Sequence, residues 1–284
     1  MLNKYMPEKM PALEKEKLLP KEIWEKNCSL PLDLEKVPTP DVIKEVMPTV
    51  EELFEEYKKL AEVMKVVSLD LDIIRHGETA HNLERRFTGT ADVGLTAKGE
   101  EQAKKAGQDI KAKGKSYDLI IKSGLRRTDA TANLALAEAG LDLKNLAMVT
   151  DSRINERCFG EHANKHQDDF EPDEKAKGYS YGRQFPGGEN YSMVIGKLIW
   201  FLNDLFKAAQ DFQDQSNRPM RVLLSGHGGT LRMLLGILNE VKDREEIRKS
   251  TVANAQVIEY PGQKFYNWAQ FISNEELQAS IDKH

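Results

Sequence analysis

The stretch LDLDIIRHGET, residues 69–79, decides the fold, because a short apolar run ends directly in Arg75, His76 and Gly77. An apolar run rich in leucine and isoleucine predicts a buried strand, which we place at residues 66–74. A glycine just after a strand lets the backbone approach a ligand closely. The sequence therefore predicts a strand whose carboxyl end presents an arginine and a histidine to a ligand.

Further apolar runs predict more strands, at residues 117–123, 146–150, 220–226 and 255–260. Amphipathic patterns between them predict helices at residues 95–114, 125–140 and 188–212, the last beginning with the GGEN segment. Strands that alternate with helices indicate a mainly parallel sheet. We therefore expect an α/β fold, a three-layer sandwich with helices on both faces of the central sheet.

The ends of three predicted strands carry unusual chemistry. The strand at 117–123 runs into SGLRRTDATA, and the strand at 220–226 runs into SGHGGTLRMLL. Ligands of open α/β sheets bind outside the carboxyl ends of the strands. We therefore expect His76, His227 and several arginines to meet at one edge of the sheet.

The N-terminal region differs from the rest of the chain. Residues 1–65 contain seven prolines between short charged segments, which does not suit a packed α/β core. Its clearest element is a predicted amphipathic helix at 49–66, which Thr49 can cap. We expect residues 1–65 to form a largely helical or irregular arm and residues 66–284 to form the catalytic domain.

Composition narrows the class of protein. The chain has 284 residues and a formal net charge of -5 with both signs interspersed, which does not indicate a nucleic-acid binder. The N-terminus lacks the apolar run of a signal peptide, and no stretch is apolar enough for a membrane span, so we expect no membrane association and a cytoplasmic location. Cys28 and Cys158 have no CxxC spacing, and His162 and His166 have no HExxH context, so we expect no metal site.

Four blocks, in this order along the chain, resemble the histidine phosphatase superfamily, which includes the cofactor-dependent phosphoglycerate mutases. These blocks are IIRHGETAHNLERRFTGTADVGLTAKGEEQAKKAG from residue 73, SGLRRTDAT from 123, INERCFG from 154 and SGHGGTLRMLL from 225. The resemblance covers about residues 67–260 and leaves out the arm. It implies phosphoryl transfer through a phosphohistidine on a small phosphorylated metabolite, with no metal and no required cofactor.

The resemblance also implies the roles of individual residues. His76 would be the nucleophile, Glu156 the general acid and base, and Arg75, Arg127 and His227 the donors to the phosphoryl oxygens. A neutral imidazole is a good nucleophile near pH 7, and arginine binds phosphate in a bidentate way that lysine cannot reproduce. The expected substrate-binding residues are Asn82, Thr88, Gly89, Arg157, Lys165, Arg183 and Gly228.

Some of these residues have plainer interpretations. Arg157 could equally form a surface ion pair, and we expect Arg86, Arg126 and Arg232 to be solvated or structural. The helix at 49–65 could serve as a lid or as the contact of a homodimer.

Three functions remain open from the sequence. The region between Glu156 and the GGEN segment is short and lacks the arginine pair and proline run of the family's mutases, and Phe159 stands where mutases usually have tyrosine. These features favour a phosphomonoesterase. The segment FTGTADVGLT is mutase-like, and a mutase would depend on 2,3-bisphosphoglycerate. The third hypothesis is a catalytically silent scaffold, because fold alone does not fix function. It is less favoured because the chain keeps all four residues expected to be catalytic, His76, Arg127, Glu156 and His227.

Overall fold

The structure is a computed structural model that describes residues 18–29, 67–169, 185–238, 247 and 252–260. Its centre is a five-stranded sheet of order β3-β2-β4-β1-β5. The strands are β1 (Leu69–Arg75), β2 (Leu119–Lys122), β3 (Met148–Thr150), β4 (Met220–Gly226) and β5 (Val257–Tyr260). The first four run parallel, and β5 pairs antiparallel with β1. The predicted strands are therefore confirmed, with the last one antiparallel.

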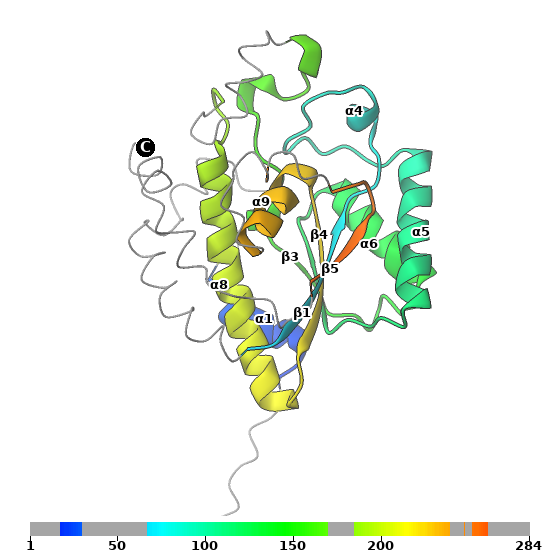
Figure 1. The fold of residues 1–284 in the computed structure, drawn as a ribbon, viewed down its shortest axis with the longest axis vertical. Coiled ribbons are helices and arrows are strands. Elements are labelled where there is room, and N and C mark those ends of the chain that lie inside the picture. Colours follow the sequence, from blue (N-terminus) through cyan, green and yellow to red (C-terminus); the bar gives the residue numbers. More distant parts are fainter. Residues whose placement is uncertain (1–17, 30–66, 170–184, 239–246, 248–251, 261–284) are drawn as a thin grey trace, which may run out of the picture.

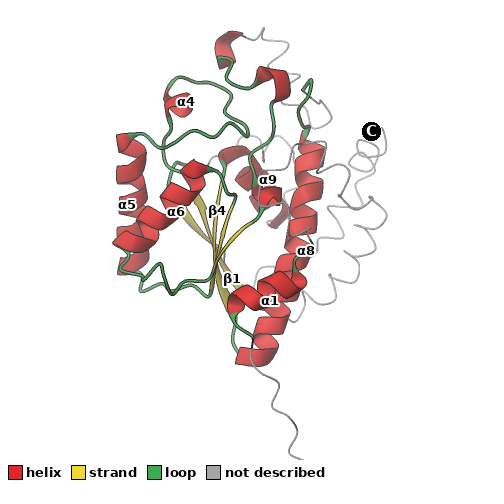
Figure 2. Cartoon of the chain, turned by 180° about the vertical axis from the view of Figure 1, so that it is seen from behind, coloured by secondary structure: helices red, strands yellow, loops and turns green. Residues whose placement is uncertain are grey.

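Helices cover both faces of this sheet (Figures 1 and 2). One face carries α5 (Ala97–Ala112) and α6 (Arg126–Glu138), and the other carries α8 (Tyr191–Ser216), α9 (Gly228–Leu238) and α1 (Pro20–Asn27). The short helix α4 (Ala80–Leu83) lies in the loops beyond the carboxyl ends of the parallel strands (Figure 1). The predicted three-layer α/β fold is confirmed.

Side-chain alternation along the strands assigns each residue to one layer. Leu69, Leu71 and Ile73 of β1 belong to the core under α8 and α9, whereas Ile74 belongs to the core under α5 and α6. Successive residues of a strand point to opposite faces, so both faces of a parallel sheet must be apolar. Because both of its faces are buried, β1 has a defined position in the sheet. The position of His76, which follows Arg75 directly, is thereby set as well.

Helix boundaries follow local capping signals. The side chain of Thr96 accepts a hydrogen bond from the backbone N–H of Gly99 at the start of α5. Asn190 accepts from Met193 in the same way at the start of α8, so the GGEN segment leads into this helix as predicted. An oxygen side chain at this position satisfies one of the N–H groups that a helix leaves without an internal partner.

One helix of the N-terminal region was not predicted. Helix α1 buries Ile23 and Trp24 in the core that α8 shares with the sheet, with the Trp24 and Phe201 ring centroids 5.9 Å apart. Lys26 and Asn27 both contact Asp211 of α8 at 2.8 Å. The predicted helix at 49–66 lies outside the described residues, so its placement remains a prediction.

Candidate active site

Two histidines meet at the carboxyl edge of the sheet because their strands are neighbours in register. Arg75 of β1 is paired with Gly226 of β4, so the next residues, His76 and His227, follow side by side. The backbone N–H of His76 donates to the carbonyl of Gly226 at 3.0 Å. The two imidazole centroids lie 5.3 Å apart, as the sequence predicted for a shared site.

One ring nitrogen of His76 forms a hydrogen bond with the backbone. Its Nδ1 lies 2.7 Å from the carbonyl oxygen of Gly77, which can only accept, so Nδ1 carries the proton. Burial, together with the charges of Arg127 and Arg75, holds the pKa of His76 well below its ordinary value of 6.5. The ring is therefore neutral at pH 7, and the lone pair of Nε2 is available for nucleophilic attack.

Both ring nitrogens of His227 form hydrogen bonds. Its Nδ1 accepts a hydrogen bond from Nε of Arg127 at 3.2 Å, and its Nε2 donates to the hydroxyl of Ser123 at 2.8 Å. Burial and the nearby Arg127 keep the pKa of His227 well below 6.5. The ring is fully buried and does not line the cavity, so His227 orients Arg127 here, whereas the sequence predicted direct contact with phosphate.

The guanidinium of Arg127 is held on three sides. Besides His227, it donates to the carbonyls of Gly89 and Ala91, each at 2.7 Å. Burial lowers the pKa of Arg127 to about 10, while the charge of Glu156 opposes that shift. The side chain is therefore still cationic at pH 7, and its fork is fixed before any ligand arrives.

Arg75 offers a donor that no described residue uses. Its Nη1 donates to the carbonyl of Val252 at 2.7 Å, but its buried Nε makes no hydrogen bond within the described part of the chain. A buried donor without an acceptor is rare and calls for an explanation. Arg75 lines the cavity, so an anion bound there would supply the acceptor.

Glu156 lies at the N-terminus of α9. Its carboxylate accepts from the backbone N–H groups of Gly229 at 2.9 Å, Thr230 at 3.2 Å and Arg157 at 3.0 Å. These three donors fix the orientation of the carboxylate beside the cavity. A Cβ on Gly229 would come within 2.5 Å of Oε1 of Glu156, so only glycine allows this close approach.

The loop that carries α4 lines another side of the cavity. Thr79 caps α4 by accepting from the N–H of Asn82, whose amide oxygen accepts from the N–H of Thr79. The NH₂ group of Asn82 is then the part that can donate to an anion. Gly89 has φ +52°, and a Cβ there would meet Phe159 at 2.9 Å, so this position requires glycine on both counts.

Arg157 is not a surface residue. Its side chain is buried, with the guanidinium carbon 4.0 Å from the ring centroid of Tyr191 and 4.9 Å from those of Phe159 and Phe185. Stacking on aromatic faces stabilises a cation that has left water. The alternative of a surface ion pair is therefore excluded, and Arg157 lines the cavity.

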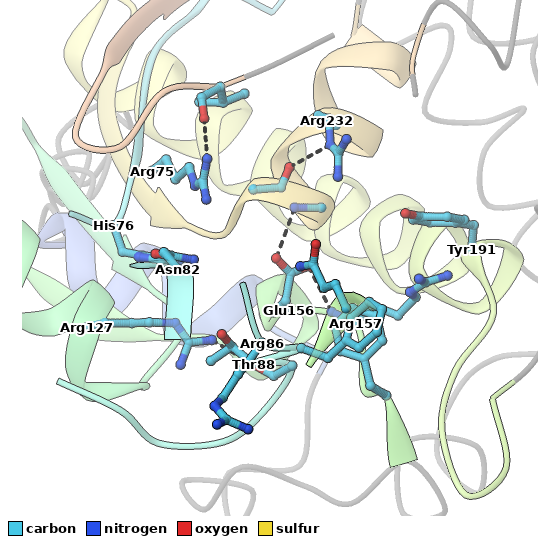
Figure 3. A pocket seen from close by; sticks show the side chains of 17 residues that line it. Arg75, His76, Asn82, Arg86, Thr88, Arg127, Glu156, Arg157, Tyr191 and Arg232 are labelled. Carbon is cyan, nitrogen blue, oxygen red and sulfur yellow. Dashed lines mark hydrogen bonds between the residues drawn. The ribbon is translucent and has the colours of Figure 1, made fainter. Parts of the chain in front are cut away.

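The cavity has a volume of about 240 Å³ and gathers most of the predicted residues. Its lining includes Arg75, His76, Asn82, Thr88, Gly89, Arg127, Glu156, Arg157 and Gly228. In Figure 3 Arg75 and Arg232 approach from one side, and Arg127 and Arg86 from the other. Among the lining residues of the described chain, five are arginines and Glu156 alone is acidic. The cavity therefore attracts anions even though the whole chain is acidic.

Two arginines that we expected to be solvated or structural, Arg86 and Arg232, also line the cavity. Arg86 has a structural role as well, because it is paired with Glu84 at 2.6 Å and donates to the carbonyl of Asn164 at 2.9 Å. Arg232 lies one helical turn after Gly228, a spacing that could have revealed it, whereas the place of Arg86 depends on loop geometry. Arg126, in contrast, is exposed and bound to Asp92, as expected.

Of the predicted substrate contacts that the structure describes, Lys165 is not brought into the site. Lys165 is exposed and is not among the cavity residues, because the preceding Asn164 adopts φ +67° in a turn. Arg183 lies outside the described residues. Within the described part of the chain, no three His, Cys, Asp or Glu side chains gather as a metal site would require.

Comparison with known proteins agrees with this geometry. The sequence profile of the histidine phosphatase superfamily (branch 1) matches residues 71–267. A 2,3-bisphosphoglycerate-dependent phosphoglycerate mutase of Mesorhizobium japonicum is 33% identical over 216 residues, 68% of this chain and 100% of the relative. One from Parvibaculum lavamentivorans is 28% identical, over 66% of this chain and 88% of the relative.

Solved structures share the fold. A putative α-ribazole-5′-P phosphatase of Escherichia coli is 27% identical with a TM-score of 0.56, covering 70% of this chain and 93% of the other. A mycobacterial glucosyl-3-phosphoglycerate phosphatase is 24% identical with a TM-score of 0.56, and the match covers 67% of this chain and 90% of the other. At this identity, the likeness supports the fold alone.

The fold and the cavity together define an α/β protein with a cavity of His76 and five arginines at the carboxyl edge of its sheet. With the matched profile, the chain belongs to the histidine phosphatase superfamily (branch 1). Members of this family are phosphatases or mutases, so an enzyme that handles phosphate esters is supported. None of the described helices combines the length and the apolar character needed to cross a bilayer.

Proposed function

We propose that this protein hydrolyses a small phosphomonoester through a phosphohistidine on His76. The observation that carries the proposal is the neutral His76 ring, whose Nδ1 is bound to Gly77 while Nε2 is left for the phosphorus atom. Arg75 and Arg127 balance the charge on the equatorial oxygens, which is the main task of a protein in phosphoryl transfer. No step of this mechanism needs a metal.

In the first step, Nε2 of His76 bonds to phosphorus, and the ester P–O bond breaks. The leaving oxygen takes a proton from Glu156. In the second step, water gives its proton to Glu156 and attacks phosphorus, the P–N bond breaks, and inorganic phosphate leaves.

The cavity also bears on the substrate. Arg75 and Arg127 suffice for one phosphoryl group, which leaves Arg86 and Arg232 at the two edges of the pocket (Figure 3). Arg86 is paired with Glu84 at 2.6 Å, but both guanidiniums add positive charge to the lining of the pocket, which favours a further anion. This excess supports a substrate with a second anionic group, such as a carboxylate or another phosphate. The small volume of the cavity supports a metabolite rather than a phosphoprotein.

Release of inorganic phosphate from 4-nitrophenyl phosphate in the presence of a chelator tests this function. The wild-type protein should turn over this ester with the chelator present, and the His76→Ala variant should not. Turnover that vanishes with chelator, or survives in His76→Ala, would contradict the proposed mechanism.

A second candidate is a phosphoglycerate mutase, which the similarity to the Mesorhizobium japonicum relative over its full length supports. Against it stands the short segment between Glu156 and Asn190, which lacks the arginine pair and proline run of the mutases. A phosphohistidine without these groups is more open to water. Interconversion of 3-phosphoglycerate that depends on 2,3-bisphosphoglycerate, and exceeds phosphate release, would favour the mutase.

A further inference from the structure

A buried ion cluster lies three residues before Glu156. The fully buried Arg153 donates from Nη1 to Asp204 at 2.5 Å and from Nη2 and Nε to Asp151 at 2.6 and 3.0 Å. Burial opposes the charge of Arg153, but the two carboxylates outweigh it and raise its pKa above the ordinary value. A guanidinium can be buried at acceptable cost only when carboxylates pair with it in good geometry.

This cluster ties the loop that carries Glu156 to α8. Arg153 belongs to the 3₁₀ turn η1 (Ser152–Ile154), and Asp151 caps that turn by accepting from the N–H of Arg153 at 2.9 Å. Asp204 belongs to α8. On the far side of the turn, the carbonyl of Asn155 accepts from the hydroxyl of Thr230 at 2.8 Å. The backbone before Glu156 is thus held between α8 and α9.

The chain segment after α1 completes the cluster. Both the backbone N–H and the hydroxyl of Ser29 donate to Oδ2 of Asp204, at 2.9 and 2.7 Å. The same hydroxyl accepts from Nε1 of Trp200 at 2.5 Å, and the ring of Trp200 lies 4.9 Å from the guanidinium carbon of Arg153. Asp204 is buried, and a buried carboxylate needs such donors. Ser29 lies outside the residues that match the family profile.

We propose that Arg153 and Ser29 are positioning residues for Glu156, so that Ser29, in the segment after α1, fixes the acid–base group of a cavity that Ser29 itself does not line. Neither residue lines the cavity, so both act through the backbone that leads to Glu156. The proposal rests on the proposed role of Glu156. The N-terminal segment then sets how well the leaving group is protonated, and substrate affinity does not depend on it.

Leaving-group dependence provides the kinetic test. Phenyl phosphate needs more protonation of its leaving group than 4-nitrophenyl phosphate does, so Glu156→Gln should slow the phenyl ester more. Ser29→Ala should reproduce this pattern, with kcat for phenyl phosphate lower by roughly 10-fold and KM unchanged, because small misplacements of a catalytic group are costly. Ser29→Thr, which keeps the hydroxyl, should restore kcat, and Arg153→Lys should behave like Ser29→Ala.

Lys26→Ala is the matched control. It removes an exposed contact between α1 and Asp211 of α8 but leaves the Arg153 cluster intact, so the wild-type leaving-group dependence should persist. If Lys26→Ala lowers kcat as much as Ser29→Ala does, docking of α1 as a whole is responsible and the positioning role is overturned. Equal losses for both esters in Ser29→Ala would overturn it too.

A second measurement is independent of turnover. The backbone amides of Gly229 and Thr230 donate to Glu156, so their hydrogen exchange, followed by NMR, reports on the position of its carboxylate. Ser29→Ala should speed exchange at these two amides, and Lys26→Ala should not. Unchanged exchange in Ser29→Ala would overturn this inference even in an active enzyme, whereas a wild type that hydrolyses neither ester overturns only the proposed function.

Discussion

Arg126 and Arg127 are adjacent in sequence but have opposite surroundings. Arg126 is exposed and paired with Asp92, whereas Arg127 is buried and reaches Gly89, Ala91 and His227 with separate nitrogens. The difference follows from the start of α6, where successive side chains point about 100° apart around the helix axis. One residue therefore faces solvent and the next faces the cavity.

Arg127→Lys should lower kcat/KM by roughly 100-fold. An ammonium group cannot replace the two-pronged hydrogen bonding of a guanidinium to the phosphoryl oxygens, on which negative charge develops in the transition state. The measurement is steady-state turnover of 4-nitrophenyl phosphate. Arg126→Lys is the matched control and should remain close to wild type. Equal losses in both variants would show that Arg127 has no special task at the phosphoryl group.

At the scale of elements, the N-terminus of α9 holds Glu156. The N–H groups of Gly229 and Thr230 bind its carboxylate, and Gly228 packs against Arg75 so closely that a Cβ would lie 3.0 Å from the guanidinium carbon. Gly228 and Gly229 therefore allow the helix backbone to approach two charged side chains closely. Their function is steric rather than conformational, since neither has a positive φ.

Gly229→Ala should displace Glu156 and lower kcat for phenyl phosphate by at least roughly 10-fold. The same change should not unfold the protein, because alanine is favoured over glycine within a helix by about 1 kcal/mol. The check is kcat together with the midpoint of thermal unfolding. Gly94→Ala, where a Cβ would meet nothing within 4 Å, is the control and should leave kcat intact. Full activity of Gly229→Ala would contradict the place given to Glu156.

The sequence predicted the elements whose signals are local. Apolar runs located the strands, and the parallel order brought His76 and His227 together at one edge. Helix α1 was missed because its eight residues lie in a proline-rich region, and such a short helix needs tertiary packing, which α8 supplies in the described part of the chain. The exposure of Lys165 and the inward position of Arg86 depend on loop conformation, which side-chain type alone does not specify.

At the scale of the whole molecule, two buried neutral imidazoles couple stability to pH. Burial and neighbouring arginines hold the pKa values of His76 and His227 well below 6.5 in the folded state. The unfolded chain binds protons on both histidines as pH falls through 6.5, while the folded chain does not. The free energy of unfolding should therefore be fully retained above pH 6.5 and decrease as pH falls below it, down to the lowered values.

Urea unfolding between pH 8 and pH 5 measures this slope. His227→Gln should make the decrease shallower, because it removes one of the two groups. A wild-type stability that does not change across this range would contradict the burial of neutral rings at the site.

The central claim is that the phosphoryl group passes through His76, and trapping the intermediate tests it most directly. The protein would be mixed with 4-nitrophenyl phosphate, quenched in alkali, which preserves phosphohistidine, and mapped by peptide mass spectrometry. The account predicts one phosphoryl group on the peptide containing His76 and none in His76→Ala. A phosphoryl group on any other side chain, or its persistence in His76→Ala, would contradict it.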